Sequence, residues 1–397
     1  MKRSPLKRIV FLIAPLSLTF LFLLLSACSN ETDDPAKSPS HSATDDIGLN
    51  TPNNENNNTQ QHLQRQLSER VSVDAQVIIP NITSLPTVDV DLVTFDSDVI
   101  RNALFDPASI VTEEVVYAGS LGITQLIDDS DFFCSYWTYD KDSVLRSHTG
   151  SQEYIFYLFR WQERYTNTEL FSTELELGFA SRDFVINEIL NAVKSLGIGT
   201  SSLGEPLIYS LDHETLATEN MRKRDDGEFE GYRNFTFKEN WTDEDDYYFI
   251  LWEFEAQEIS IVSEEMRLLL NDDIVRGSKI AALYSQRGIE YLEITNAFTE
   301  TSTGSASQII SLEDAMSAMV AKFESIISTN RYVITDIKLK YIPEFKDRSR
   351  TSQQLIPVWD ISIAEYYSSH ADSADNDILV GHIQHYLIDA YTGREYV

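Results

Sequence analysis

Much of this chain alternates apolar and polar residues at every second position, and that pattern restricts what it can fold into. Successive side chains of a β-strand point to opposite faces, so an alternating segment covers a core with one face only. The pattern therefore predicts a protein built mainly of strands. We expect strands or extended segments in VSVDAQVIIPNI (71–82), VDVDLVTF (88–95), EYIFYLFRWQ (153–162), TELELGFA (173–180), EPLIYSLD (205–212), DYYFILWEFEAQEISIV (246–262), GIEYLEITNAF (288–298), YVITDIKLKYIPEF (332–345), LIPVWDISIAEYY (355–367) and HIQHYLIDAYTGREYV (382–397).

A first helix is predicted in SRDFVINEILNAVKSLGIG (181–199), where apolar residues recur every three or four positions. Ser181 is a candidate N-cap, and Gly197 is a candidate C-terminal stop. Residues 97–150, in contrast, give no clear pattern.

A second helix is predicted in SLEDAMSAMVAKFESIIS (311–328). Ser311 begins it, and Asp314 stands where a capping box has its acidic partner. Met316 and Met319 lie on its apolar stripe, so we interpret them as core residues and not as a metal or haem site.

The order of these segments predicts the fold class. Each half of the chain has a strand, one helix and then a run of strands that we expect to pair antiparallel. A helix packed on one face of an antiparallel sheet is a common α+β arrangement. We therefore expect antiparallel sheets, each with a helix on one face, in two similar subdomains. The two halves are too different in sequence to establish an internal duplication.

The N-terminus has the layout of a secretory signal peptide. Residues 1–27 begin with four basic side chains and continue as an apolar run that ends in small residues. A permanent transmembrane helix is the alternative, because the run is near the lower length limit for a span. Pro15 within the run, and the lack of basic residues directly after it, favour a cleaved signal.

Residues 25–28, Leu-Ser-Ala-Cys, resemble the lipobox of bacterial lipoproteins. The resemblance implies cleavage before Cys28, diacylglycerol on the Cys28 thiol and acylation, for example with palmitate, of the new N-terminus. Two or three acyl chains anchor a protein stably, whereas one does not. We therefore expect a protein attached to the extracytoplasmic face of the cell membrane.

Cysteine content and charge add two constraints. Once Cys28 is lipidated, Cys134 has no partner for an intrachain disulfide, and we expect it to be a buried small hydrophobic residue. The formal net charge is −32 over 397 residues. A field of this sign repels nucleic acid and anionic lipid headgroups, which excludes both as partners. It attracts cations or basic proteins, or serves only to keep the protein soluble.

Composition divides the chain into four parts. After the signal peptide (1–27), residues 28–72 are rich in Asn, Ser, Thr, Asp and Gln and predict a disordered tether. Residues 73–280 form an expected N-terminal α+β domain, and residues 281–397 an expected C-terminal one.

The C-terminal part resembles the PepSY-type module. The resemblance rests on ISLEDAMSAMVAKF (310–323), LIPVWDISI (355–363) and YLIDAYTGREYV (386–397). LIPVWDISI and the two-part layout also resemble the YycH and YycI regulatory proteins and uncharacterised lipoproteins of Clostridia-type bacteria. The resemblance implies a binding or regulatory role outside the membrane, such as inhibition of a protease or control of a sensor kinase. YycH and YycI proteins usually carry a transmembrane helix, which is at odds with the lipobox.

The residues of these motifs have structural explanations. Asp389 and Gly393 predict a tight turn, with Asp389 bonding backbone N–H groups and Gly393 at positive φ. Pro357 lies early in its strand, where a missing N–H costs least. Trp359 alternates with Ile361 and Ile363 as a core stripe.

No motif in the sequence predicts a metal or cofactor site. His382 and His385 are three residues apart on an expected strand, so they point to opposite faces and do not converge on zinc. Acidic clusters occur at DEDD (243–246) and DSADND (372–377). The second lacks the spacing and the Gly and Glu of an EF-hand loop, and we interpret it as a solvated hairpin loop between two strands, with loose surface calcium binding as the alternative. His148 and His213 are expected in polar loops, with no partner visible in the sequence. No HExxH, CxxC, phosphate loop or GxSxG occurs.

Our leading hypothesis is therefore a non-enzymatic lipoprotein that binds an envelope protein or a peptide in a regulatory role. The alternative is an envelope hydrolase or carbohydrate-binding protein that uses acidic and aromatic residues in a cleft. A substrate-binding lipoprotein of a transporter fits less well, since such proteins usually alternate strands and helices in two α/β lobes.

Overall fold

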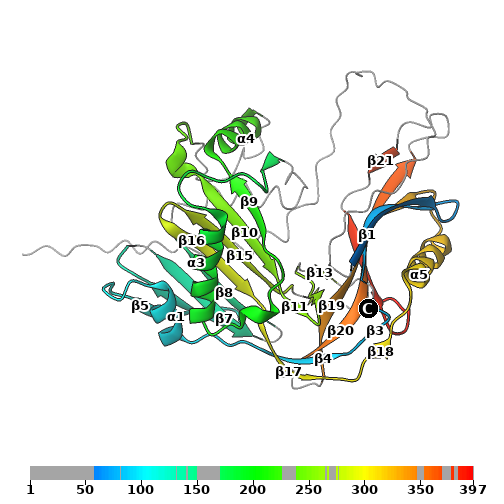
Figure 1. Ribbon diagram of the computed structural model, residues 1–397, viewed down its shortest axis with the longest axis horizontal. Helices are drawn as coiled ribbons and strands as arrows, with labels where there is room; N and C mark the ends of the chain where they lie inside the picture. The colour runs from blue at the N-terminus through cyan, green and yellow to red at the C-terminus, as the bar shows by residue number, and fades with distance from the viewer. Residues whose placement is uncertain are drawn as a thin grey trace, which may run out of the picture. The chain divides into compact units, whose positions relative to one another are not determined.

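The computed structural model describes most of the chain after residue 57. The described residues are 58–80, 82–130, 132–139, 142–149, 170–225, 238–263, 266–267, 274–275, 277–346, 353–368, 377–379 and 383–396. The signal peptide, Cys28, the strand expected at 153–162, His382 and residues 372–376 lie outside them. Residues 56–397 form one compact unit. The described part contains two large sheets with helices packed on them (Figure 1), so the expected α+β class is confirmed.

Strands from both ends of the chain build one sheet, here called the terminal sheet. Among the described strands its order is β1-β2-β19-β20-β4-β17, and β21 and β22 also pair with β20. β2 and β19 run parallel, and the other described pairs of this sheet are antiparallel. The strands are β1 (Asn58–Gln66), β2 (Val71–Pro80), β4 (Val88–Leu92), β17 (Phe298–Thr303), β19 (Arg331–Phe345), β20 (Gln353–Ser368), β21 (Asp377–Leu379) and β22 (Gln384–Asp389).

The second sheet, here called the middle sheet, is antiparallel with the order β5-β6-β7-β8-β16-β15-β10-β9 among the described strands. These strands are β5 (Thr112–Ala118), β6 (Leu121–Ile127), β7 (Phe133–Tyr139), β8 (Asp142–His148), β9 (Leu207–Leu211), β10 (Tyr247–Glu253), β15 (Lys279–Ser285) and β16 (Gly288–Thr295). Short pairs are β3 (Ser84–Leu85) with β18 (Ser307–Gln308), β11 (Glu255–Ala256) with β12 (Ile259–Ser260), and β13 (Met266–Arg267) with β14 (Ile274–Val275).

The helices form where their caps and apolar stripes predict them. α3 (Arg182–Ser195) lies across one face of the middle sheet (Figure 1), with Ser181 as N-cap and Gly197 at φ +83° after its end. α5 (Leu312–Ser325) packs on the terminal sheet, and its capping box between Ser311 and Asp314 is present. Both predicted helices are thereby confirmed. The structure adds α1 (Ser97–Leu104), α4 (His213–Asp225) and the 3₁₀ turns η2 (Thr200–Ser202) and η3 (Asp243–Asp245).

The expected tether at 28–72 needs correction at its end. Residues 58–66 form β1, which pairs along its whole length with β2. β1 is polar and therefore lacks the alternation of a half-buried strand. Pairing with an apolar neighbour satisfies its backbone on one side, and an edge strand tolerates polar side chains.

The strand expected at 173–180 is also absent, because this segment is irregular. Its burial does not alternate: residues 173–176 are all exposed, and Leu177 is buried. Its backbone is held by side chains rather than by a neighbouring strand: Leu177 N donates to Tyr248 Oη at 2.6 Å. The alternation of apolar and polar residues in this segment therefore did not mark a strand, because no neighbouring strand pairs with it in the described structure.

The sheets do not divide the chain at the expected boundary between 280 and 281. That boundary falls inside β15, and residues 58–92 contribute strands to the same sheet as residues 331–389. Local sequence patterns cannot show this arrangement, because it rests on pairing between strands about 250 residues apart.

β19 has one apolar and one charged face, and a β-bulge sets which residues lie on each. Thr335 is an extra residue between Ile334 and Asp336 in the pairing with β20. Before the bulge, Tyr332 and Ile334 face the core, and Phe323 of α5 stacks on Tyr332 with ring centroids 4.1 Å apart. After it, residues 337, 339 and 341 face the core, and residues 336, 338 and 340 face away. The bulge thus keeps three charged side chains out of the core.

The motifs near the C-terminus have the structural roles expected. Asp389 Oδ1 accepts hydrogen bonds from Tyr391 N and Thr392 N, and Gly393 has φ +70°. Trp359, Ile361 and Ile363 are buried. Pro357 lies between the part of β20 that pairs with β4 and the part that pairs with β22, so its missing N–H breaks no ladder there.

Deleting Thr335 tests the role of the bulge. The deletion either turns Tyr332 and Ile334 out of the core or turns Asp336 and Lys338 into it. Loss of two buried apolar side chains alone predicts destabilisation by about 3 kcal/mol or more, measured by urea unfolding. Thr335→Ser keeps the residue count and its hydroxyl, and we expect it to unfold near the wild-type midpoint. Wild-type stability of the deletion variant would show that the bulge does not determine which residues of β19 face the core.

Candidate functional site

The charged face of β19 carries Asp336, Lys338 and Lys340 in a row. They share a face because they alternate after the bulge. Lys340 is buried, and Asp336 and Lys338 are partly buried. Charged side chains are seldom buried without partners, so the row indicates a site or a network.

The two neighbouring strands extend this row across the sheet. Asp360 of β20 lies opposite Lys338, and Ser362 lies opposite Asp336. His385 of β22 lies opposite Ser362. Asp360 and Ser362 are both buried. Three adjacent strands therefore present charged or polar side chains on the face that α5 does not cover.

A chain segment that follows β10 completes the site. Glu253 is the last residue of β10, and Ser263 follows the short β11–β12 pair. The segment is held on β19 by backbone contacts, since Ile261 forms a bridge with Tyr341 and Val262 N donates to Tyr341 O at 2.9 Å. Backbone pairing thus brings Glu253 to lysines of β19 that are about 90 residues away in sequence.

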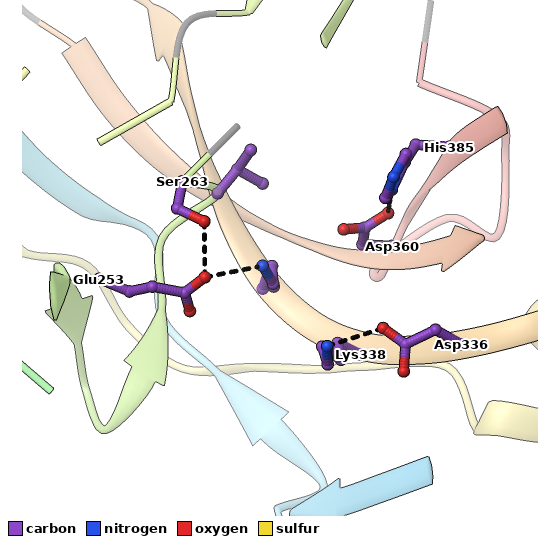
Figure 2. A pocket seen from close by; sticks show the side chains of 8 residues that line it. Glu253, Ser263, Asp336, Lys338, Asp360 and His385 are labelled. Atoms are coloured by element: carbon purple, nitrogen blue, oxygen red, sulfur yellow. Dashed lines mark hydrogen bonds and ion pairs between the residues drawn. The ribbon is translucent and has the colours of Figure 1, made fainter. Parts of the chain in front are cut away.

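These elements enclose a cavity of about 160 Å³. Figure 2 shows the side chains of β19, β20 and β22 on one side of it and those of Glu253 and Ser263 on the other. The described residues that line it are Glu253, Val262, Ser263, Asp336, Lys338, Lys340, Asp360 and His385. We call it the charged cavity.

The charges in the charged cavity are arranged in pairs. Glu253 Oε1 accepts a hydrogen bond from Ser263 Oγ at 2.6 Å and one from Lys340 Nζ at 3.4 Å. Lys338 Nζ lies 2.7 Å from Asp336 Oδ2. These contacts are drawn in Figure 2.

A third pair joins β20 and β22. His385 Nδ1 lies 3.0 Å from Asp360 Oδ1, and Ser362 Oγ lies 3.4 Å from the same nitrogen. In a catalytic triad, one ring nitrogen of the histidine bonds to the nucleophilic serine and the other bonds to the orienting carboxylate. Because Asp360 and Ser362 share Nδ1, these three residues do not form a catalytic triad.

Burial and partner charges determine the protonation of the cavity. Burial would raise the pKa of the Glu253 carboxyl, but the charge of Lys340 and hydrogen bonds from Ser263 and Ser260 hold that pKa below its usual range. Burial would lower the pKa of Lys338, but Asp336 raises that pKa above its usual range. Near neutral pH, Glu253 and Lys338 are therefore both charged.

The other candidate residues lie apart from the charged cavity. Cys134 is buried in the core, and burial raises its pKa to about 12. Met316 and Met319 are buried on α5. His148 ends β8, where its ring lies 5.0 Å from that of Phe133. Within the described ranges, no three His, Cys, Asp or Glu side chains gather as a metal-binding group.

The acidic segment 243–246 makes hydrogen bonds and ion pairs within the protein. Asp245 accepts from Thr242 N in a capping box and pairs with Lys238. Asp246 Oδ1 lies 2.8 Å from His213 Nδ1 and accepts a hydrogen bond from His213 N, which places His213 at the start of α4. The hydrogen bond to Asp246 raises the pKa of His213.

Sequence reasoning selected only His385 among the residues of the charged cavity. A signal for the others existed in TDIKLKY (335–341), where three charges alternate with buried apolar residues. That stripe marked a polar sheet face, but Glu253 and Ser263 carry no local signal because backbone pairing across the fold brings them there.

Comparisons with known proteins identify a similar fold but no family. No protein-family model and no curated protein matches the chain. The fold is similar to that of an uncharacterised protein from Eubacterium rectale, with a TM-score of 0.56 and 14% identity; the match covers 85% of this chain and 93% of that one. At this identity the likeness shows the fold alone. The similar structure is itself an uncharacterised protein of a Clostridia-type bacterium, the kind of protein that the sequence resembles.

Replacing one partner of the Glu253–Lys340 pair tests how strongly the two are coupled. Lys340→Met leaves the partly buried Glu253 carboxylate without its cation, and we expect destabilisation of about 1–3 kcal/mol at pH 7 by urea unfolding. The double variant Glu253→Gln, Lys340→Met is expected to lose less than the sum of the single variants. Additive losses would contradict coupling.

Glu253→Gln also has an expected pH dependence. The pKa of Glu253 is lower in the folded than in the unfolded protein, so its ionisation stabilises the fold above the unfolded pKa of about 4.3. This contribution is lost as pH falls through the folded value. The stability difference between wild type and Glu253→Gln should therefore shrink below pH 4, whereas Glu300→Gln, at an exposed position, should show little change.

Proposed function

We propose that this protein is a lipid-anchored, non-enzymatic binding protein of the extracytoplasmic membrane surface, and that it binds an envelope protein or a peptide in a regulatory role at the charged cavity. The observation that carries the proposal is the pairing of charges in that cavity. A ligand with charged side chains can exchange one protein ion pair for another, which costs less than bringing a charge to an uncompensated buried site.

The same cavity gives little support to a hydrolase. Glycoside hydrolysis needs a carboxylic acid whose pKa is raised so that it can donate a proton near neutral pH. The pKa of Glu253 is instead lowered by Lys340 and Ser263. Carbohydrate binding usually uses walls of Trp, Tyr or Phe, and none of the described residues that line the cavity is one of these.

The PepSY and YycI resemblance points to the same class of function. Its helix and strands correspond to α5, β20 and β22, the elements that shape the terminal sheet behind the charged cavity. We propose the regulatory role on this ground, together with the lipobox at Cys28. Among the described residues no helix is both long and apolar enough to span a membrane.

The lipid anchor has a direct test. We expect cells that produce the chain to incorporate labelled palmitate into the wild type and into Cys134→Ser, and to incorporate none into Cys28→Ser. The reason is that the thiol of Cys28 is the proposed acceptor of diacylglycerol. Label in Cys28→Ser, or none in the wild type, would contradict the anchor.

Site-specific photo-crosslinking tests the binding function. A photoreactive phenylalanine analogue replaces His385, at the rim of the charged cavity, in cells that express the protein natively. We expect one discrete protein or peptide adduct after irradiation. The adduct should be lost with Lys338→Glu, because this substitution reverses a charge that the ligand would contact while its side chain is partly exposed.

The control places the same analogue at Glu300, an exposed residue of β17. We expect no adduct from this position. Equal adducts from both positions, or none from His385 in a folded and anchored protein, would argue against binding at the charged cavity.

A further inference from the structure

β5 is at the edge of the middle sheet among the described strands. It pairs with β6, and no described strand pairs with its other side. Five of its seven residues are exposed. An edge strand of this kind presents unpaired backbone groups to which another chain can add.

The hairpin between β5 and β6 shows which backbone groups face outward. Ala118 pairs with Leu121 across the two-residue connection Gly119-Ser120, and Gly119 has φ +66°. This is the geometry of a type II′ hairpin, in which the flanking pair exchanges both backbone hydrogen bonds. Hydrogen-bonded pairs alternate from there along the strand. The N–H and C=O groups of residues 113, 115 and 117 therefore point away from β6.

The side chains of this edge are unusually apolar for an exposed position. Val115 is 51% exposed and Tyr117 is 73% exposed. The Tyr117 ring lies beside Gly122, where an added Cβ would come within 3.5 Å of it. Native edge strands are commonly protected by Lys, Pro, a bulge or a cover. The segment Glu114–Tyr117 has no Lys, Pro or bulge, Glu114 carries its single charge, and Val115, Val116 and Tyr117 favour strands.

Charge around the edge favours a basic partner over a second copy of this chain. Glu114 is exposed and has no ion-pair partner among the described residues, and Asp129 is exposed in the adjacent β6–β7 turn. Glu113 is paired with Arg101 at 2.7 Å. Two chains that each carry a net charge of −32 repel one another, whereas Lys and Arg are attracted to this edge.

The geometry points to β5 as a docking strand for an extended segment of a partner protein, in which apolar residues alternate with Lys or Arg. The segment adds to the middle sheet through backbone hydrogen bonds to residues 113, 115 and 117. Its apolar side chains cover Val115 and Tyr117, and its basic side chains face Glu114. This is strand addition, a recurrent mode of peptide recognition. It is separate from the charged cavity and does not depend on the function proposed there.

The test uses the full-length chain in detergent and two fluorescent probes. One is an acetylated nine-residue peptide of alternating lysine and valine, and the other has glutamate in place of lysine. Fluorescence anisotropy measures binding at physiological ionic strength. We expect saturable binding of the lysine peptide and none of the glutamate peptide.

Val115→Pro removes an outward N–H and leaves the hydrogen bonds to β6 intact, and we expect it to weaken binding of the lysine peptide at least tenfold. The matched control Val115→Thr keeps the N–H and the branched side chain, and it should bind like the wild type. Glu114→Lys changes only an exposed charge, and we expect about threefold weaker binding from its loss of a cross-strand charge pair.

Three results would overturn the proposal. Equal affinity of Val115→Pro and wild type, with both folded by circular dichroism, would show that binding is not strand addition at β5. If Glu114→Lys bound the lysine peptide with unchanged affinity and the glutamate peptide also bound, the partner segment would not need to be basic. A concentration-dependent dimer that Val115→Pro abolishes would assign the edge to a second copy.

Discussion

A one-residue bulge in β19 allows this long strand to keep one face in the apolar core and the other face in the charged cavity. Between Ile334 and Asp336 the alternation of the strand changes phase, so that apolar residues face the core on both sides of the bulge. Strict alternation from Tyr332 would instead direct Asp336, Lys338 and Lys340 into the core, and each buried unpaired charge costs several kcal/mol. The charged cavity therefore exists because the bulge places these side chains on the opposite face.

The second side of the cavity depends on Tyr341. Its carbonyl accepts the N–H of Val262, and its buried hydroxyl donates to Pro86 O at 2.8 Å. One residue of β19 thereby holds the chain that follows β10 and the chain that precedes β4. Since the segment is fixed by backbone hydrogen bonds, Glu253 and Ser263 reach the sheet in a defined position. The ion pair between Glu253 and Lys340 follows from that position and does not create it.

Much of the fold was predictable, because long segments with a clear period also have strong tertiary partners. β19, β20, α3 and α5 are of this kind. The elements that the sequence did not predict depend on tertiary contacts, which a local pattern does not show. β1 is a polar edge strand that its neighbour stabilises, and α4 buries Leu216, Glu219, Asn220 and Lys223 at helical spacing, a stripe that is mostly polar and therefore not recognised as apolar. In the charged cavity, the charges that alternate along β19 could have been interpreted as one polar face. The presence of Glu253 there could not have been predicted, since Glu253 reaches that face through nonlocal backbone pairing.

The pairing of charges in the cavity has a consequence for the kind of ligand that can bind. Glu253 and Asp336 each have a lysine partner, and Asp360 has a hydrogen bond to His385, so each carboxylate that lines the cavity has a partner within the protein. A ligand with a single charge would leave one of these groups unpaired in a partly buried site. A ligand that brings both a cation and an anion can replace the internal partners pair by pair. Peptide segments have such side chains at short spacing, whereas neutral sugars do not, and this favours a peptide or protein ligand on the charged face of β19.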